Sequence, residues 1–172
     1  LGVTVMECSP QGGRGVEVGP CHGCRAITPG LGRRNAQLPA SGNRARAFDI
    51  ARNNTGRLGA QVAFHLGSWY AVEPAQNELV DVLVSNPPYI HKDDGHLQQG
   101  DLRFEPQQAL TDFDDGLSAY RALAAGCAQH VKAQGWLMVE HGFEQATDIQ
   151  AIFQAAGLQQ VQPCLLYKSD AA

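Results

Sequence analysis

The segment Ser85-Asn86-Pro87-Pro88-Tyr89 combines residue types that could orient a weakly nucleophilic nitrogen. A planar amide or exocyclic amine attacks poorly because its lone pair is delocalised into the neighbouring π system. The side-chain carbonyl of Asn86 and the backbone carbonyl of Pro87 could each accept one N–H of such a nitrogen as its lone pair turns toward an electrophile. The prolines hold these acceptors rigid, and Tyr89 offers a flat face to a planar group. Orientation of this kind can lower a barrier by roughly 7–11 kcal/mol.

This segment stands where a buried strand is predicted to end. The β-branched run from Val80 to Val84 is typical of a strand covered on both faces in a parallel sheet, and the two prolines that follow cannot donate ladder hydrogen bonds. Ligands of open α/β sheets bind at the carboxyl ends of such strands. Asn-Pro also makes ordinary strand-terminating turns. The aromatic residue after it and the buried strand before it favour a functional site.

The rest of the chain from Phe48 onward alternates helical and strand patterns, which predicts an α/β fold with an open, mostly parallel sheet. Asp114 or Asp115 is placed to cap the central helix. The predicted elements are a helix over 48–58, a strand over 60–66, the strand over 80–84, a helix from Leu117 to Val131, a strand over 135–140 and a helix from Phe143 to Phe153 closed by Gly157.

Length and composition place the chain among soluble, single-domain proteins. It has 172 residues, 44% of them hydrophobic, and a formal charge of −4 from 13 Lys and Arg against 17 Asp and Glu. No run approaches the roughly 18 apolar residues of a membrane span, so we expect a cytoplasmic protein without membrane contact. The acidic balance argues against nucleic acid as the main partner. Five cysteines, an odd number, argue against a disulfide scaffold.

The first 47 residues do not follow this alternation. Gly, Arg, Pro and Cys are scattered between Gly12 and Arg46 with neither helical nor strand periodicity, so composition alone fits a disordered tail. A second hypothesis is a frameshift. Back-translation of residues 19–31 with GC-rich codons, read one base later, can encode a small-residue amphipathic helix followed by a turn. The predicted organisation is an irregular segment over 1–47, a catalytic core over 48–162 and a tail over 163–172.

Several short motifs accompany Asn86-Pro87-Pro88-Tyr89. They are His96-Leu97, Gly100-Asp101-Leu102-Arg103-Phe104-Glu105-Pro106, Ala109-Leu110-Thr111, Asp115-Gly116-Leu117 and Glu140-His141-Gly142. Together they resemble the HemK family, the protein-(glutamine-N5) methyltransferases that modify the Gly-Gly-Gln loop of peptide chain release factors. The resemblance covers about 48–162, whereas 1–47 and 163–172 match poorly.

The resemblance implies a Rossmann-like S-adenosylmethionine-dependent methyltransferase fold, incomplete at both ends, with a release factor as protein substrate. It gives Asn86, Pro87, Pro88 and Tyr89 the role of gripping the substrate glutamine amide, and it places Asn86 beside the methyl group of S-adenosyl-L-methionine. Gly67-Ser68-Trp69 is similar to a family stretch that packs near the adenine, so Trp69 is a candidate on the cofactor side. An ordinary half-buried aromatic is the alternative for Trp69.

The cofactor loop is where the chain departs from the family pattern. The nearest match, Glu17-Val18-Gly19-Pro20-Cys21-His22-Gly23, keeps the acidic Glu17 and the glycines Gly19 and Gly23 but has Cys21 between them. The acidic residue expected on the second strand is missing, and Asp49 is expected to be solvated within a helix. Cys21 and Cys24 could be half of a metal site or a redox pair, but no second pair follows, and we expect no metal.

Other polar residues receive structural interpretations. Arg103 and Glu105 could order the loop after the substrate motif as a pair, and Glu140 and His141 end a strand, where a structural role is favoured. His65 and His91 are assigned no chemistry.

Three further functions stay open. They are adenine-N6 methylation of nucleic acid, methylation of a ribosomal-protein glutamine, and an inactive fragment of the family that cannot hold the cofactor. The mixed, acidic loop after Tyr89 argues against the first.

Overall fold

The computed structural model describes residues 15–18, 39–42, 49–50, 52–54, 57, 63–66, 69–70, 79–98 and 106–163. Within these ranges the strands are β1 (Gly15–Val18), β2 (Pro39–Gly42), β3 (Ala63–Leu66), β4 (Val80–Ser85) and β5 (Val131–Val139). The helices are α5 (Ser118–His130) and α6 (Ala146–Ala155), and the 3-10 turns are η1 (Gly95–Gln98), η3 (Gln107–Ala109) and η4 (Phe143–Gln145).

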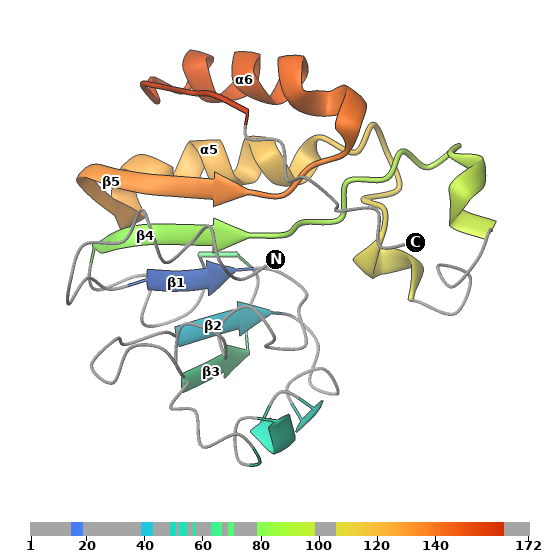
Figure 1. Ribbon diagram of the computed structural model, residues 1–172, viewed down its shortest axis with the longest axis horizontal. Helices are drawn as coiled ribbons and strands as arrows, with labels where there is room; N and C mark the ends of the chain where they lie inside the picture. Colours follow the sequence, from blue (N-terminus) through green and yellow to red (C-terminus); the bar gives the residue numbers. More distant parts are fainter. Residues whose placement is uncertain are drawn as a thin grey trace, which may run out of the picture.

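The five strands form one sheet in the order β3-β2-β1-β4-β5, and every pairing between these described strands is parallel (Figure 1). The order runs outward from β1 to β3 on one side and from β4 to β5 on the other. Its direction therefore reverses between β1 and β4. In an open α/β sheet, this switch point marks the crevice where ligands bind. The predicted open, mostly parallel sheet is confirmed.

Strand β4 lies at the centre of the described core. Val80, Val82 and Leu83 are at most 2% exposed, as predicted for a strand covered on both faces. The helix α5 packs against this strand through Leu123 and Cys127. Because β4 is apolar on both faces, it is favoured in the interior of the sheet, where it lies between β1 and β5.

A second apolar cluster joins the two helices. Tyr120 and Ala124 of α5 pack against Ile149 and Phe153 of α6, so α6 covers α5, and Leu137 and Val139 of β5 pack against the same cluster (Figure 1). The rings of Tyr120 and Phe153 meet edge to face, with centroids 6.5 Å apart. As predicted, α6 closes at Gly157, which has φ +87°. The N–H of Gly157 donates to the Gln154 carbonyl, and the N–H of Leu158 donates to the Phe153 carbonyl, each at 3.0 Å.

The structure corrects the interpretation of the first 47 residues as lacking strands. Strands β1 and β2 both lie in this stretch, each only four residues long. Four residues show no reliable period, and β2 contains both proline and glycine. Pairing with neighbouring strands stabilises β1 where its own sequence does not. It lies between β2 and β4, with Gly15 opposite Val82 and Val18 opposite Ser85.

The ends of other elements also differ from the prediction. Strand β5 begins at Val131 and not at Gly135, because Val131 both closes α5 and pairs with Val80. The extra residues form a bulge in which Gln134 has φ +67°. The helix predicted over 48–58 is described as helical at 49–50, 52–54 and 57, and Asp49 there is exposed, as expected. No helix in the described ranges is long and apolar enough to cross a bilayer.

Candidate active site

The segment Asn86-Pro87-Pro88-Tyr89 leaves the carboxyl end of β4 directly. Ser85 and Pro87 are almost fully buried, whereas Asn86, Pro88 and Tyr89 are half-buried. Pro87 therefore anchors the turn in the core and fixes the direction of its backbone carbonyl. Asn86 and Tyr89 lie nearer the surface on either side of this anchor. The predicted grip on a planar amide needs this combination of a rigid base and partly exposed polar and aromatic groups.

The strand that carries Glu17 is the neighbour of β4. Glu17 pairs in register with Val84, and Val18 pairs with Ser85, so β1 and β4 end side by side at the switch point. The structure thus brings the backbone of Glu17 close to the start of the substrate segment. The other predicted residues of the cofactor loop, Gly19 and Gly23, lie outside the described residues.

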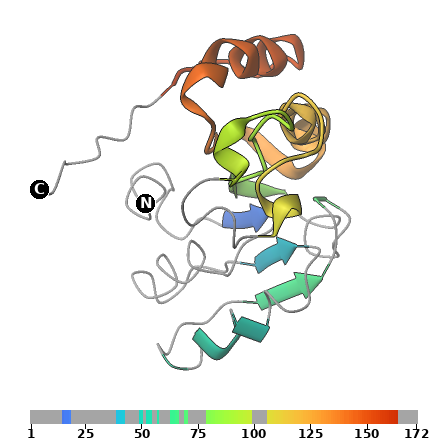
Figure 2. The same ribbon diagram turned by 90° about the vertical axis from the view of Figure 1, so that its right-hand side faces the viewer.

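Beyond Tyr89 the chain is clamped against the segment that precedes α5. Ile90 forms a parallel bridge with Thr111, and its N–H donates to the Leu110 carbonyl at 2.8 Å. The N–H of Lys92 donates to the Asp114 carbonyl at 3.2 Å. Figure 2 looks onto the carboxyl ends of the strands and shows η1 and η3 in front of the sheet at this end. The described parts of the chain after β4 therefore lie beside the tip of this strand.

Asp112 organises the turn that leads into α5. Its carboxylate accepts the N–H groups of Asp114 at 2.9 Å, Gly116 at 3.0 Å and Ser118 at 3.1 Å, and the Ser118 hydroxyl at 2.5 Å. Partial burial opposes ionisation of Asp112. The hydrogen bonds from Ser118, Asp114 and Gly116 outweigh this effect and lower its pKa below the ordinary value of 3.8.

This turn corrects the predicted helix cap. The residue at the N-cap of α5 is Leu117, and Asp112, which the sequence analysis did not select, takes the N–H of Ser118. Asp115 accepts the N–H of Leu117 at 2.9 Å and pairs with Arg121 at 2.5 Å, so it supports the first turn from the side. The Arg121 guanidinium, with the Leu117 N–H, lowers the pKa of Asp115. Asp114 supplies its own N–H to Asp112 and does not cap α5.

A glutamine that the sequence analysis did not select joins three loops at this end of the sheet. Gln145 Nε2 donates to the Tyr89 carbonyl at 2.8 Å and to the Gly116 carbonyl at 3.4 Å. Its Oε1 accepts the N–H of Gly142 at 3.0 Å. Gly116 has φ +74°, and a β-carbon there would overlap the Tyr89 carbonyl, so this approach requires glycine. The spacing Gly-x-x-Gln before a helical run could have indicated a capping glutamine.

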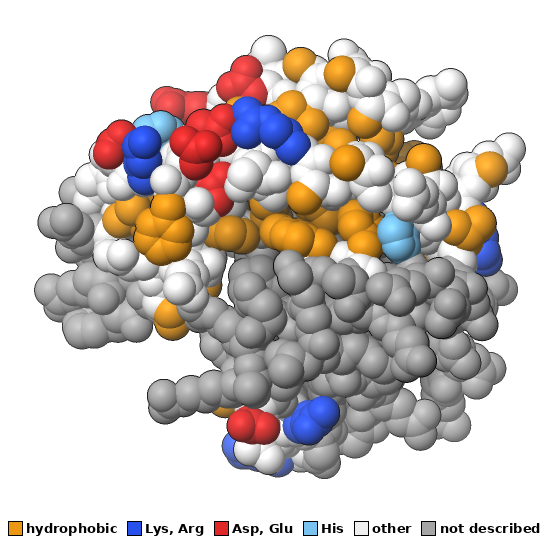
Figure 3. All heavy atoms as spheres, turned by 180° about the vertical axis from the view of Figure 1, so that it is seen from behind, with side chains coloured by type: hydrophobic (Ala, Val, Ile, Leu, Met, Phe, Trp, Pro, Cys, Tyr) orange, Lys and Arg blue, Asp and Glu red, His pale blue; other side chains and the backbone are white. Residues whose placement is uncertain are grey.

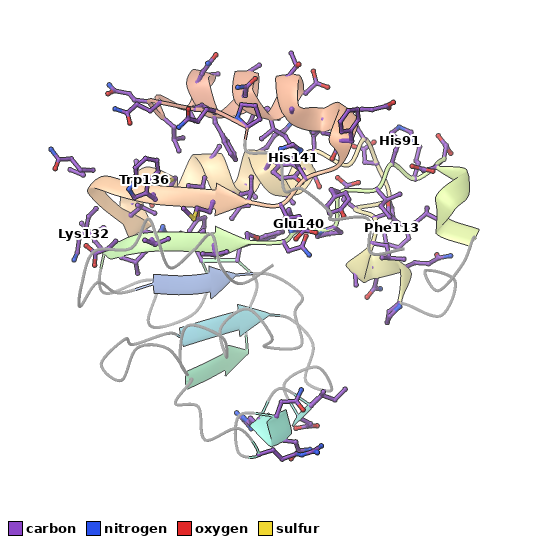
Figure 4. The ribbon with its side chains drawn as sticks, in the orientation of Figure 1. His91, Phe113, Lys132, Trp136, Glu140 and His141 are labelled. Atoms are coloured by element: carbon purple, nitrogen blue, oxygen red, sulfur yellow. The ribbon has the colours of Figure 1, made fainter. Side chains whose placement is uncertain are left out.

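The Glu140-His141-Gly142 stretch closes the other side of the strand tip through its backbone. The Glu140 N–H donates to the Ser85 carbonyl at 3.0 Å, and the Tyr120 hydroxyl donates to the Glu140 carbonyl at 2.8 Å. Burial, with the nearby Tyr89, Glu140 and Asp112, raises the pKa of Tyr120, so it stays a neutral donor. His141 Nδ1 lies 2.7 Å from the Gly142 carbonyl. These bonds give the stretch a structural role, and Figure 4 shows Glu140 and His141 beyond the arrowheads of β4 and β5.

Trp69 packs against the cluster that joins β4 to α5, and it is half-buried with φ +48°. Its neighbour Tyr70 donates its hydroxyl to the Leu123 carbonyl at 2.8 Å and stacks on His130 with ring centroids 4.1 Å apart. The packing alternative for Trp69 therefore has direct support. Its place on the cofactor side stays a prediction.

The remaining candidates are placed as follows. His91 is exposed, and its Nδ1 accepts the Asp93 N–H at 3.1 Å within a local turn. His65 lies in β3, whereas Arg103, Glu105, Cys21 and Cys24 lie outside the described residues. In the part of the chain that the structure describes, no three His, Cys, Asp or Glu side chains gather as a possible metal site.

The fold is that of known methyltransferases. The structure is similar to a methyltransferase from Pyrococcus furiosus, with a TM-score of 0.66 and 16% identity over 89% of this chain and 68% of that one. It is also similar to precorrin-6y C5,15-methyltransferase from Geobacter metallireducens GS-15, with a TM-score of 0.60 and 11% identity over 90% and 68% of the two chains. These similarities define the class: a Rossmann-like methyltransferase fold, which confirms the predicted fold class.

The sequence identifies the family within this class. The chain is 43% identical over 158 residues to release factor glutamine methyltransferase from Neisseria gonorrhoeae (strain ATCC 700825 / FA 1090), which is 92% of this chain and 58% of the relative. It is 44% identical over 146 residues to the enzyme of the same name from Xylella fastidiosa (strain Temecula1 / ATCC 700964), covering 84% and 52%. The chain belongs to the family of the release factor glutamine methyltransferases.

The matched regions of this chain and of its relatives differ in extent. The chain spans about half the length of the curated relatives that it matches. The alignment with the Neisseria gonorrhoeae protein leaves only 14 of 172 residues outside, so it extends well into the first 47 residues, further than the predicted core over 48–162. No family model matches the chain.

Proposed function

We propose that this protein transfers the methyl group of S-adenosyl-L-methionine to the glutamine side-chain nitrogen in the Gly-Gly-Gln motif of peptide chain release factors. One observation carries the proposal. The segment Asn86-Pro87-Pro88-Tyr89 stands at the tip of β4, at the switch point beside β1, in a chain 43% identical to a protein named for this activity. A release factor as substrate places the reaction in the cytoplasm.

The residues at the strand tip would perform most of the work by orientation. The Asn86 side-chain carbonyl and the Pro87 backbone carbonyl accept the two N–H groups of the substrate amide, and the Tyr89 ring packs against its plane. When bound, S-adenosyl-L-methionine supplies an electrophilic methyl group on a sulfonium sulfur. The two carbonyl acceptors would turn the lone pair of the amide nitrogen toward that methyl group, and the nitrogen, once it had gained the methyl group, would give up one of its N–H protons to water.

The fit of the cofactor rests on the adjoining ends of β1 and β4. Glu17 lies in β1 opposite Val84, and in this class of fold an acidic residue and glycines after the first strand hold the ligand. The predicted holders are therefore Glu17, Gly19 and Gly23, with Asn86 beside the methyl group and Trp69 toward the adenine.

A protein substrate suits the charge around the strand tip better than nucleic acid does. Figure 3 shows charged side chains, most of them acidic, gathered at this end of the described surface. In the described parts of 90–98 and 106–121, which lie at this end, the acidic residues are Asp93, Asp94, Asp112, Asp114 and Asp115, and the basic residues other than histidine are Lys92 and Arg121. A phosphate backbone would be repelled by such a surface.

The test is direct transfer. We would incubate the chain with S-adenosyl-L-methionine and a release factor, and measure by mass spectrometry the peptide that contains the Gly-Gly-Gln motif. A parallel reaction would use a form in which the reading frame upstream of Phe48 has been corrected. We expect one added methyl group on the glutamine. A form that binds the cofactor but leaves this glutamine unmodified, or that methylates adenine in DNA instead, would reject the proposal.

A further inference from the structure

We propose that Gln145 is a positioning residue for methyl transfer, which holds the substrate-gripping segment in place through the Tyr89 carbonyl. This inference rests on the proposed function and adds a residue that lies outside the substrate segment. Gln145 is the last residue of η4, 56 positions from Tyr89 in the sequence, and its side chain is half-buried against the strand tip.

The side chain of Gln145 forms a bridge between three loops. One side-chain amide bonds three loops that follow β4, precede α5 and follow β5, at Tyr89, Gly116 and Gly142 respectively. The shortest of these bonds, 2.8 Å, is made to the Tyr89 carbonyl. Pro87 anchors the start of the Asn86-to-Tyr89 turn in the core, but neither proline has a backbone N–H that could bond another loop. The Gln145 amide is a donor from another element that bonds the far end of this turn.

This bridge differs from ordinary helix capping. The Gln145 N–H also donates to the Gly142 carbonyl at 3.1 Å, so Gln145 and Gly142 bond reciprocally before α6. Glutamate serves this capping role as well as glutamine does, since only an acceptor is needed. The Tyr89 carbonyl, by contrast, requires a donor. A glutamate at position 145 would keep the cap, but its carboxylate oxygen would face the Tyr89 carbonyl oxygen, and both are acceptors.

Hydrogen exchange on the chain itself tests the bridge. We would compare Gln145→Glu and Gln145→Met with the wild type at the amides of Ile90 and Lys92, which bond to Leu110 and Asp114. We expect the Ile90 and Lys92 amides to exchange at least tenfold faster in both variants than in the wild type. In Gln145→Glu, which keeps the cap, the α6 amides should exchange at the wild-type rate. Gln150→Glu is the matched control, because Gln150 lies in α6 and its side chain bonds Val161. A role in capping alone would leave Gln145→Glu like the wild type, and that result would overturn the inference.

Steady-state kinetics test the consequence for transfer. In the form that methylates release factor, Gln145→Glu should lower kcat at least tenfold while the Kd for S-adenosyl-L-methionine stays unchanged, because the described side-chain bonds of Gln145 join the loops that hold the substrate amide. An unchanged kcat would refute the positioning role. If the wild type transfers no methyl group to release factor, the proposed function fails by itself, and the exchange experiment still decides whether Gln145 holds the segment.

Discussion

Asn86 is the residue on which the proposed chemistry depends most. It follows a strand residue, Ser85, that is 1% exposed, and it precedes a proline that is buried in the core. Its backbone is therefore fixed on both sides, so its side chain can act without reorganisation when a substrate amide binds. Preorganised polar groups are effective because no ordering has to occur during the reaction.

Replacement of Asn86 by alanine should remove one of two amide acceptors and leave the fold intact. We expect Asn86→Ala to lower kcat about 100-fold to 1,000-fold, as loss of a preorganised polar group does in other active sites. The measurement is the rate of methyl transfer to release factor, with the midpoint of thermal unfolding as a check on folding. Asn53→Ala, at an exposed helical position, is the control and should retain full activity. Equal rates for the two variants would remove Asn86 from the mechanism.

At the residue scale, the sequence predicts the position of a residue where its motif is local. Asn86, Pro87 and Tyr89 are adjacent in the chain, so the sequence alone placed them together at the end of a strand. Gln145 and Gly116 reach the same place only because α5 and β5 return the chain to the strand tip. No spacing in the sequence reports a contact between positions so far apart.

At the scale of elements, the turn before α5 depends on one carboxylate. Asp112 replaces a helix cap by bonding three backbone N–H groups and one hydroxyl. The sequence placed the cap within the same acidic stretch but on Asp114 or Asp115, since a cap normally stands next to the first helical residue. The chain turns between Asp112 and α5, so the Asp112 carboxylate can accept the Ser118 N–H from six positions earlier in the sequence.

Stability should follow the ionisation of Asp112. Its pKa is lowered in the folded protein, so its contribution is complete above the ordinary value of 3.8 and is lost as the pH falls through the lower, folded value. We expect Asp112→Asn to cost about 1–3 kcal/mol at neutral pH, because the N–H donors lose a charged acceptor. The difference from the wild type should shrink below pH 3.8. Urea unfolding across this range measures the difference, and Asp114→Asn, at an exposed neighbouring position, is the control substitution. A constant difference at all pH values would contradict the assignment.

At the scale of the whole molecule, the sequence predicted the type of sheet but not all of its strands. The alternation from Phe48 onward indicated a parallel α/β sheet, whereas β1 and β2 were not recognised because each is short and defined by its neighbours. The consequence concerns the cofactor. Pairing with β4 forms β1 and sets Glu17 beside the strand tip, but pairing of four residues does not supply the glycine-rich approach that a cofactor requires.

The reading frame upstream of Phe48 is therefore the variable that should decide cofactor affinity. We predict that the coding sequence upstream of Phe48 contains a shifted frame that encodes closely spaced glycines after an acidic residue. A protein restored in this way should bind S-adenosyl-L-methionine at least about tenfold more tightly than the present chain, because the backbone can then approach the ligand and a helix N-terminus can face it. Isothermal titration of both forms measures the difference. Glu17→Gln in the restored form should weaken binding, whereas Glu144→Gln, at an exposed position in η4, should not. Micromolar binding by the present chain, without any restoration, would show that its own loop holds the cofactor and that no frameshift is needed.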